Sequence, residues 1–469
     1  MNRSILVRIL RLAWPVLVAQ IAVVGSGLMD TVMAGRLSAL DLAAVGVGAS
    51  IYITVFVTAM GVLMALTPIV AQHYGAGRYA EIGEDVRQCA WLALLLAIIA
   101  MGLLRYPEPF IALAKLTPAM EEKVRAYLRA VSWAVIPGLG FRLFYGLMTG
   151  IGRPRAIMTF NLIFLIAKAP LNAVFMYGLD MGATGCGIAT AVAAWPTMAL
   201  VWIWYAYQFS SERGQARELP SPPSPERGAG GRSVDPYGVL ARFTWPRPAA
   251  ILELVRVGLP IGFTLLVEVT AFTFMALFIA RLGPAVSAAH QIAANLAVLT
   301  YMAPLSIGQA ALVLAGHALG AGDAAAARHT GLTGIMLGVA VAALVAGGLW
   351  LGAEQVAALY TPDAAVRRVA APLIALVALS HLGDALQAIV INLLRGYKRT
   401  VVPMLIYAVS LWGVGLGGGY LLALGDFLGA PRGAAGFWLA AAAALTLAGG
   451  VALIYFLAVS RKTLTRQPS

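Results

Sequence analysis

Long apolar runs, each separated from the next by a short polar stretch, recur along the whole of this 469-residue chain. Each run can cross about 30 Å of hydrocarbon as an α-helix, for which about 20 residues suffice. The strict alternation of apolar and polar positions that is typical of membrane β-barrels is absent. The pattern therefore predicts an all-α integral membrane protein with twelve transmembrane helices. The twelve runs are centred near residues 24, 58, 97, 140, 168, 196, 268, 303, 342, 382, 412 and 446.

The two halves of the chain repeat each other. Arg11 and Pro15 recur 245 positions later as Arg256 and Pro260, and further matches keep this offset. Six spans per half give both halves the same orientation in the membrane. We therefore expect two pseudo-symmetric six-helix lobes around a central cavity, an architecture typical of transporters. The further matches are Arg36-Leu37 with Arg281-Leu282, and Gly75-Ala76-Gly77 with Gly320-Ala321-Gly322.

One extended polar stretch, residues 210–250, separates the halves and contains seven prolines and six arginines. Such a composition cannot build a hydrophobic core, so it predicts a linker on the cytoplasmic side. The expected domains are an N-terminal lobe over 1–209, the Pro/Arg-rich linker over 210–250 and a C-terminal lobe over 251–469. A passive tether is the simpler interpretation of the linker, and a regulatory or partner-binding role is the alternative.

Charge distribution gives the topology. The chain is 61% hydrophobic and 11% charged, which excludes an ordinary soluble domain. Its net charge of +13 is carried by Arg and Lys in alternate loops, which favours a positive-inside arrangement with both termini cytoplasmic over nucleic-acid binding. Residues 105–129 mix both signs of charge and predict a short surface helix. Cys89 and Cys186 indicate neither a disulfide nor a metal site.

Three of the 20 acidic side chains lie well inside apolar runs: Asp30, Glu268 and Asp384. A carboxylate at bilayer depth costs roughly 2.5–3.5 kcal/mol on insertion scales, so such residues usually face a cavity, pair with a cation or bind a proton. None of the three has an acid at the equivalent position of the other half. An acid needed to fold the repeat would be expected in both halves, so the pattern favours a functional role over a structural hydrogen bond.

Six short stretches spread over both halves carry a recognisable pattern. They are Trp14-Pro15, Asp30-Thr31-Val32-Met33-Ala34-Gly35, Leu66-Thr67-Pro68, Val267-Glu268-Val269-Thr270, His290-Gln291-Ile292-Ala293 and Leu394-Arg395-Gly396-Tyr397-Lys398. In these stretches the chain resembles the multidrug and toxic compound extrusion (MATE) family, NorM type, and the likeness covers nearly the whole chain except the linker. The resemblance implies a bacterial inner-membrane antiporter that expels small cationic, amphipathic drugs in exchange for Na⁺ or H⁺, without a cofactor. We expect a monomer in the lipid bilayer.

The resemblance also implies roles for the three acids. Asp30 would be the cation or proton site of the first lobe, and Glu268 with Asp384 would form the site of the second. Two carboxylates on facing helices can ligate one Na⁺, or share a proton because they resist ionising together. Glu268 and Asp384 are therefore the expected Na⁺ ligands if the transporter is sodium-coupled.

The chain departs from the family pattern at two positions. Lys168 stands where the family commonly has Asn. One possibility is that it pairs with Asp30 as a built-in cation; the alternative is that its side chain extends toward the membrane surface or stays neutral. Pairing would weaken a first-lobe Na⁺ site and shift coupling to the second lobe. Ser380 stands where some sodium-linked relatives have Tyr, one turn before Asp384, which leaves the choice between Na⁺ and H⁺ open.

Four further polar residues are weaker candidates for supporting roles. Asn172 and Thr190 complete a first-lobe cluster or serve helix packing. His381, one turn from Asp384, relays protons or is a hydrogen-bonded interior residue. Gln291 faces the cavity or packs between helices.

Two other functions fit the sequence less well. A flippase for lipid-linked precursors would need several arginines to bind pyrophosphate, whereas the span interiors carry acids opposed by Lys168 and Arg142. An intramembrane enzyme would need a nucleophile or a metal motif, and none is found.

Overall fold

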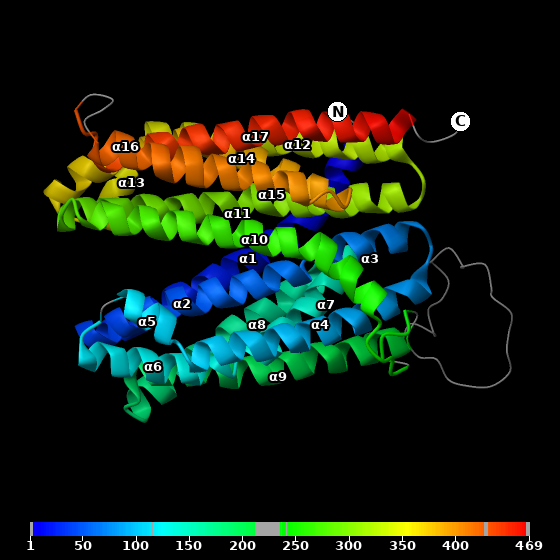
Figure 1. Cartoon of the computed structure of the whole chain (residues 1–469), viewed down its shortest axis with the longest axis horizontal. Coiled ribbons are helices and arrows are strands. Elements are labelled where there is room, and N and C mark those ends of the chain that lie inside the picture. Colours follow the sequence, from blue (N-terminus) through cyan, green and yellow to red (C-terminus); the bar gives the residue numbers. More distant parts are fainter. Residues whose placement is uncertain are drawn as a thin grey trace, which may run out of the picture. The chain divides into compact units, whose positions relative to one another are not determined.

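The computed structural model describes residues 3–114, 116–211, 235, 237–240, 242–425 and 430–465. The first half of the chain forms long helices that short turns connect (Figure 1). In order these are α1 (Arg3–Leu37), α2 (Ala39–Leu63), α3 (Leu66–Gly75), α4 (Tyr79–Arg105), α5 (Glu108–Ala114), α6 (Pro118–Ser132), α7 (Val135–Gly150), α8 (Arg155–Asn172), the π-helix η1 (Ala173–Gly178) and α9 (Gly182–Ser211).

The second half repeats this order, including a short helix after the third span and a π-helix in the fifth. Its elements are α10 (Pro248–Ala280), α11 (Pro284–Gly320), α12 (Ala324–Leu351), α13 (Ala353–Tyr360), α14 (Ala364–Gly396), α15 (Val401–Ala408), the π-helix η3 (Val409–Gly417), α16 (Gly418–Leu424) and α17 (Ala434–Thr465). The described residues form helices and no strands, so the predicted all-α membrane fold is confirmed.

The helices are long and apolar enough to cross a membrane in the predicted number. Eleven segments of the described chain pass this test by length and composition, and the bent pair α6–α7 makes a twelfth if it is counted as one span. The two members of that pair meet at an angle of 45°. This bent pair is the fourth span, whose apolar run Arg142 interrupts.

The polar segment before the fourth span forms more than the short surface helix that its sequence predicts. Only α5 is a separate short helix, whereas α6 leads directly into α7. Arg125 of α6 donates to Glu121 one turn earlier and, over 2.7 Å, to Glu108 of α5. This guanidinium holds the pKa of the Glu108 carboxyl below its usual range. Lys123 pairs over 2.6 Å with Asp41 at the start of α2, so α6 is tied to its bundle by charge as well.

The chain divides into two compact units. The N-terminal unit comprises Val18–Gly262, and the C-terminal unit comprises Met1–Leu17 with Phe263–Ser469. Each unit is a bundle of helices that run roughly side by side (Figure 1). The helices α1 and α10 each contribute to both units, and each changes unit two residues after an internal proline, Pro15 or Pro260.

The sequence repeat extends to the backbone of the turns. Gly152 has a φ of +77° in the turn after α7, and Lys398, 246 positions later, has a φ of +54° in the turn after α14. In both turns the next amide donates over 2.8 Å to the carbonyl five residues before it. A left-handed conformation costs a residue other than glycine roughly 1–2 kcal/mol. The turn is therefore kept in the second half although its sequence no longer favours it.

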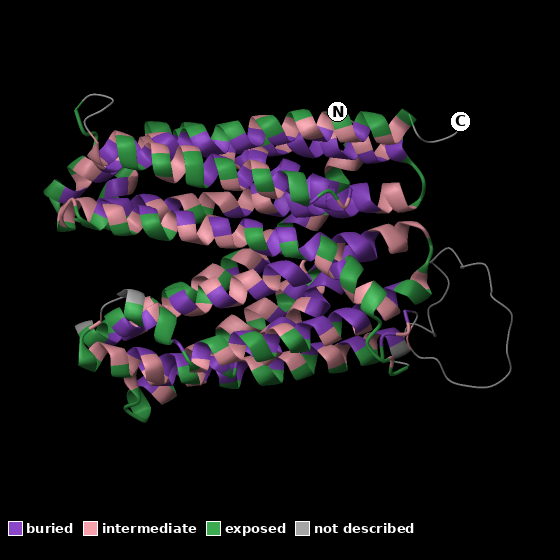
Figure 2. Ribbon diagram, viewed as in Figure 1, coloured by how far each residue is buried: buried purple, intermediate pink, exposed green. Residues whose placement is uncertain are grey.

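Large apolar side chains cover the outside of the helices. Leu344, Leu351 and Ile454 are 78%, 83% and 69% exposed, respectively. Along most helices a buried stripe alternates with exposed residues (Figure 2). Exposed apolar surface on this scale is unfavourable in water and matches the interior of a bilayer.

The described part of the predicted linker packs against the beginning of α4. Arg87 of α4 donates to the Gly238 carbonyl and, from Nε over 3.1 Å, to the Thr244 hydroxyl. Glu84, one turn earlier, accepts from the same guanidinium over 2.8 Å and so orients it. We call the described residues 237–240 and 242–247 the strap; residues 212–234, 236 and 241 lie outside the described residues.

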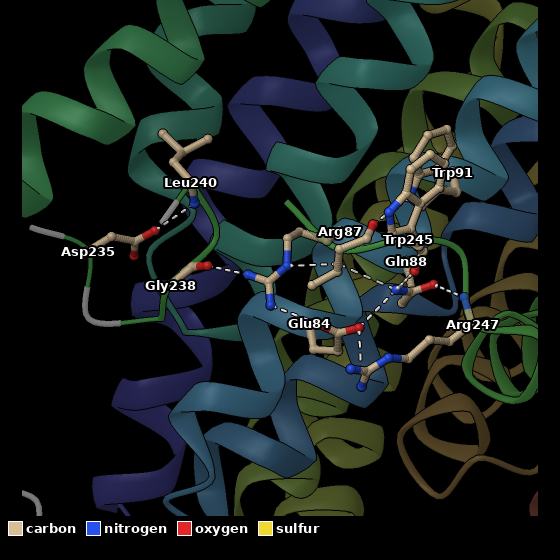
Figure 3. Close-up of polar contacts among 10 residues, drawn as sticks. Glu84, Arg87, Gln88, Trp91, Asp235, Gly238, Leu240, Trp245 and Arg247 are labelled. Atoms are coloured by element: carbon tan, nitrogen blue, oxygen red, sulfur yellow. Dashed lines mark hydrogen bonds and ion pairs between the residues drawn. The ribbon is translucent and has the colours of Figure 1, made fainter. Parts of the chain in front are cut away.

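A second pair of α4 side chains holds the later part of the strap. Gln88 donates to the Trp245 carbonyl over 3.0 Å and accepts from the Arg247 amide over 2.7 Å. The Trp91 indole donates to the Thr244 carbonyl over 2.9 Å. Figure 3 shows these side chains directed from α4 toward the strap. Because they bind backbone groups, the strap is held in a defined register along α4.

Close backbone contact and an anchor on α9 complete this arrangement. A Cβ atom added at Gly83 of α4 would lie 2.0 Å from the Tyr237 carbonyl oxygen, so only glycine fits there. The Asp235 carboxylate accepts from Tyr205 of α9 over 2.7 Å and from the Leu240 amide over 3.0 Å. The strap is therefore part of the N-terminal unit.

Candidate functional site

Asp30, on α1 in the N-terminal unit, is bound by two side chains of α8. The Lys168 ammonium lies 2.6 Å from Oδ2 of the carboxylate, and the Asn172 amide donates to Oδ1 over 2.7 Å. The Lys168 side chain is 4% exposed and that of Asp30 is 13% exposed. Three sequence-predicted residues thus lie together, and Lys168 pairs with Asp30 instead of extending toward the membrane surface.

The local structure of α8 explains why its two polar residues face the same carboxylate. Lys168 and Asn172 are four residues apart and therefore lie on one face of the helix. Between them is Pro170, which lacks an amide hydrogen, and the backbone continues as the π-helix η1 from Ala173. Single turns of π-helix within α-helices are frequent at functional sites.

Two residues that the sequence did not suggest as site residues join this cluster. Ser26, one turn before Asp30 on α1, accepts from the Lys168 ammonium over 3.2 Å. The Cys186 thiol of α9 hydrogen-bonds the Asp30 carboxylate. The four-residue spacing of Ser26 and Asp30 was a usable signal, whereas nothing in the sequence around Cys186 pointed to α1.

Thr190, the other first-half candidate, lies one turn after Cys186 on α9. Its hydroxyl donates to the Cys186 carbonyl over 3.0 Å, which is a bond within its own helix. Thr190 therefore supports the helix that presents Cys186.

The second cluster lies in the C-terminal unit. Glu268 of α10 and Asp384 of α14 lie within electrostatic range of each other, and both are partly buried. The Tyr407 hydroxyl of α15 hydrogen-bonds the Glu268 carboxylate, and Tyr301 of α11 lies within range of both acids. Four helices thus converge on the two carboxylates, as expected for a polar site inside an apolar bundle.

A buried arginine belongs to the same cluster. Arg395, in the last turn of α14, is 6% exposed and lies within electrostatic range of Glu268. Its guanidinium also lies 3.5 Å from the Asn392 side-chain oxygen. Arg395 was not among the site candidates that the sequence suggested. A usable signal was that the arginine is not repeated, since Thr149 occupies the equivalent position of the first half.

The remaining candidates of the second half have other surroundings than the two acids. Ser380 is buried and donates to the Val377 carbonyl of its own helix over 2.9 Å. His381 is buried, and its Nε2 has no hydrogen-bond partner in the described part of the chain. Gln291 of α11 is exposed on its unit. Ser380 and His381 thus share a helix with Asp384 without a recorded bond to it.

The two clusters differ in the way their charge is balanced. In the N-terminal unit Asp30 has one ammonium at contact distance. In the C-terminal unit two carboxylates share the neighbourhood of one guanidinium. Among the described residues no group of three or more His, Cys, Asp or Glu side chains could hold a metal ion.

Comparison with known proteins places this geometry in context. The MatE family model matches residues 15–174 and 260–421. The chain is similar to a probable multidrug resistance protein NorM of Aromatoleum aromaticum, with 39% identity over 94% of this chain and 91% of the relative. It is 36% identical to a protein of the same description from Chromobacterium violaceum, over 97% of this chain and 94% of the relative.

Solved structures show the same fold at low sequence identity. The Vibrio cholerae MATE transporter VcmN in the bent form matches with a TM-score of 0.80 and 18% identity, over 98% of both chains. The eukaryotic MATE transporter AtDTX14 matches with a TM-score of 0.81, also at 18% identity and over 98% of both chains. Both similarities cover nearly all of this chain.

Proposed function

The chain belongs to the MATE family of multidrug transporters, and from this membership we propose that it exports cationic, amphipathic compounds in exchange for Na⁺ or H⁺. It is a multi-pass membrane transporter and not an enzyme. The observation that carries the proposal is the pair Glu268 and Asp384, which lie within electrostatic range of each other on two membrane-spanning helices. Acids in such a position are costly and mark ion pathways.

In the proposed cycle the coupling ion and the drug cation compete for the same negative charge. Na⁺ or H⁺ binds at Glu268 and Asp384 and neutralises them, so an organic cation loses its electrostatic attraction and leaves. After the binding site has become accessible from the other side of the membrane, the ion departs and a new organic cation binds. This cycle requires the two carboxylates to be ionised in one state and neutralised in the other, because a permanently neutral pair could not exchange cations.

Surrounding residues assist this exchange in the proposed mechanism. Tyr407 holds the Glu268 carboxylate in place by its hydrogen bond, and its hydroxyl oxygen can also contribute to binding of Na⁺. Asp30 takes part either as a second cation or proton site or as the partner of Lys168. Ser380, His381 and Gln291 have supporting roles at most in this proposal.

We also propose a bacterial inner-membrane location with both termini cytoplasmic, and a monomeric transporter. A membrane location is supported by the long apolar helices, and the topology by the excess of Arg and Lys in alternate loops. Reporter fusions at each terminus test the topology: activity of a cytoplasm-specific reporter at both ends is expected. A protein mass near 49.1 kDa, after correction for detergent in light scattering, would support the monomer.

The test of the transport proposal is efflux of a fluorescent organic cation from proteoliposomes. A Na⁺ gradient and a pH gradient are imposed in separate experiments, and efflux driven by either one supports antiport and identifies the ion. Glu268→Gln should lower ion-driven efflux by about tenfold or more, since a 1.4 kcal/mol loss of binding already corresponds to tenfold.

Glu253→Gln is the matched control, because it makes the same chemical change at an exposed position of the same helix. Undiminished efflux by folded Glu268→Gln protein would remove Glu268 from the mechanism. No response of the wild-type protein to either gradient would reject antiport and favour a flippase for lipid-linked precursors.

A further inference from the structure

We propose that Lys168 is the resident counter-cation of Asp30, so that the N-terminal unit contains no exchangeable ion and the coupling ion binds only in the C-terminal unit. This inference rests on the proposed antiport and specifies where its coupling takes place. It assigns Lys168 a role in determining how many ions are exchanged for each drug molecule.

The contacts of Lys168 are those that a bound cation would make. Its ammonium lies 2.6 Å from Asp30 Oδ2 and 3.2 Å from Ser26 Oγ, two oxygens presented one turn apart by α1. The same nitrogen lies 5.9 Å from the centre of the Phe164 ring, a distance at which a cation is attracted to the aromatic face. The position next to Asp30 is therefore already filled by a positive charge that belongs to the chain.

The other side of the carboxylate is occupied as well. Asn172, which is fully buried, donates to Asp30 Oδ1 over 2.7 Å. The Lys168 ammonium and the Asn172 amide thus each contact one oxygen of the Asp30 carboxylate. A proton or a Na⁺ ion would have to displace these buried donors, and within the described part of the chain Asp30 is the one carboxylate in contact with the ammonium. Occupation by an external ion is therefore disfavoured.

The C-terminal unit lacks an equivalent balance. Glu268 and Asp384 lie within range of each other, and Arg395 is the basic group recorded near Glu268 among the described residues. One negative charge thus remains for an external cation to neutralise. At the offset of 246 that holds in this part of the repeat, the position equivalent to Lys168 is Val414, so the tethered cation of the first half is not repeated.

The decisive experiment counts the ions exchanged for each drug molecule. Proteoliposomes with the membrane potential clamped at zero are loaded with a monovalent fluorescent cation, and its gradient at equilibrium is measured against the imposed gradient of the coupling ion. On logarithmic axes the slope is the number of ions per drug. Lys168→Asn should raise the slope by one, because Asp30 then becomes a second site that an external ion fills and leaves in each cycle.

Arg142→Met is the matched control, since it removes another basic side chain from a span of the same unit. Arg142 stacks on the Tyr145 ring, with 4.8 Å from its guanidinium carbon to the ring centre, and is not a recorded partner of Asp30. The slope should stay at the wild-type value. An unchanged slope in transport-competent Lys168→Asn protein would overturn the proposal.

A second variant keeps the proposal testable if Lys168→Asn does not fold. Asp30→Asn/Lys168→Met replaces the ion pair by two neutral side chains and should keep the wild-type slope and at least half of the efflux rate. Asp30→Asn alone should lose most of its transport, because it leaves a buried ammonium without its carboxylate. Folded double-variant protein that loses transport would overturn the assignment of Lys168. Failure of the wild-type protein to couple efflux to any ion would instead reject the antiport itself, and this proposal with it.

Discussion

In the proposed mechanism Arg395 lowers the negative charge of the ion site without contacting the transported ion. Its guanidinium lies within electrostatic range of Glu268, and the side chain is buried. A positive group there weakens the attraction of the two carboxylates for any cation. In an exporter such weakening favours release, because a cation that binds too tightly cannot leave.

This role predicts that Arg395→Gln binds cations more tightly. Removal of one elementary charge from a buried cluster is expected to lower the dissociation constant of a monovalent organic cation by roughly tenfold, about 1.4 kcal/mol. Drug release should become slower, so efflux should fall although binding improves. Calorimetric titration of the purified protein and efflux from proteoliposomes measure the two effects.

The control for that variant is Arg399→Gln, an exposed arginine four residues further along the chain. It should leave the dissociation constant unchanged. If Arg395→Gln and Arg399→Gln behaved alike, the guanidinium of Arg395 would have no specific influence on the site.

At the residue scale the sequence predicted the acids and their first partners better than the remaining neighbours. Asp30, Lys168 and Asn172 come together because a carboxylate and an ammonium in apolar spans both need a partner. Arg395 was missed because its position at the end of an apolar run looks the same in sequence whether the side chain turns inward or outward. Ser380 was placed among candidates for an ion site, yet its hydroxyl is bonded to its own helix.

Among the segments of the chain, the strap is the one whose contacts were least predictable from the sequence. Its prolines and arginines predicted a linker, and composition alone does not record that Arg87, Gln88 and Trp91 of α4 offer matching partners for its backbone. The helices themselves were predictable because the length and apolarity of a span are set by the bilayer. The bend between α6 and α7 was indicated only as an irregular fourth run.

Gly83→Ala should dislodge the strap. A Cβ atom at this position would lie 2.0 Å from the Tyr237 carbonyl oxygen, and the backbone on both sides is held by hydrogen bonds. Overpacking of this kind costs about 1–3 kcal/mol. We expect faster tryptic cleavage after Arg242 in the strap and a lower melting temperature.

Gly102→Ala is the matched comparison, because it makes the same change in the same helix with no atom within 4 Å of the new Cβ. Its melting temperature should stay the same or rise, since alanine favours a helix by about 0.8–1.0 kcal/mol over glycine. Equal cleavage of both variants would mean that the strap does not depend on close contact at Gly83.

For the whole molecule, the repeat predicted the order of the helices but not how the chain distributes them between compact units. The beginning of α1 belongs to the C-terminal unit, and the beginning of α10 belongs to the N-terminal unit. Within the N-terminal unit, a Cβ atom at Gly258 of α10 would lie 2.0 Å from the Val62 carbonyl oxygen of α2, so these two helices touch through their backbones. Periodicity reveals which segments are equivalent, whereas such contacts depend on side-chain shape.

This distribution predicts that a chain cut between residues 212 and 234 stays assembled. Each fragment would carry the beginning of a helix that belongs to the unit formed mainly by the other fragment. With a specific protease site inserted there, the two fragments should co-purify after cleavage and retain at least half of the efflux activity. Affinity capture of one fragment followed by gel analysis checks the association, and uncut protein with the same insertion is the control. Separation of the fragments in mild detergent would contradict the prediction.

The ion pair between Asp30 and Lys168 also has a consequence for biosynthesis. The two residues are 138 positions apart, and the ribosome adds about 5 to 20 residues per second, so the lysine emerges roughly 7 to 28 seconds after the aspartate. During this interval α1 must enter the membrane by virtue of its apolar residues alone, with a carboxylate that costs roughly 2.5–3.5 kcal/mol. Docking of α8 then gives the carboxylate an ammonium and an amide partner, so the polar contacts of the first helix are complete only after the fifth span has been inserted.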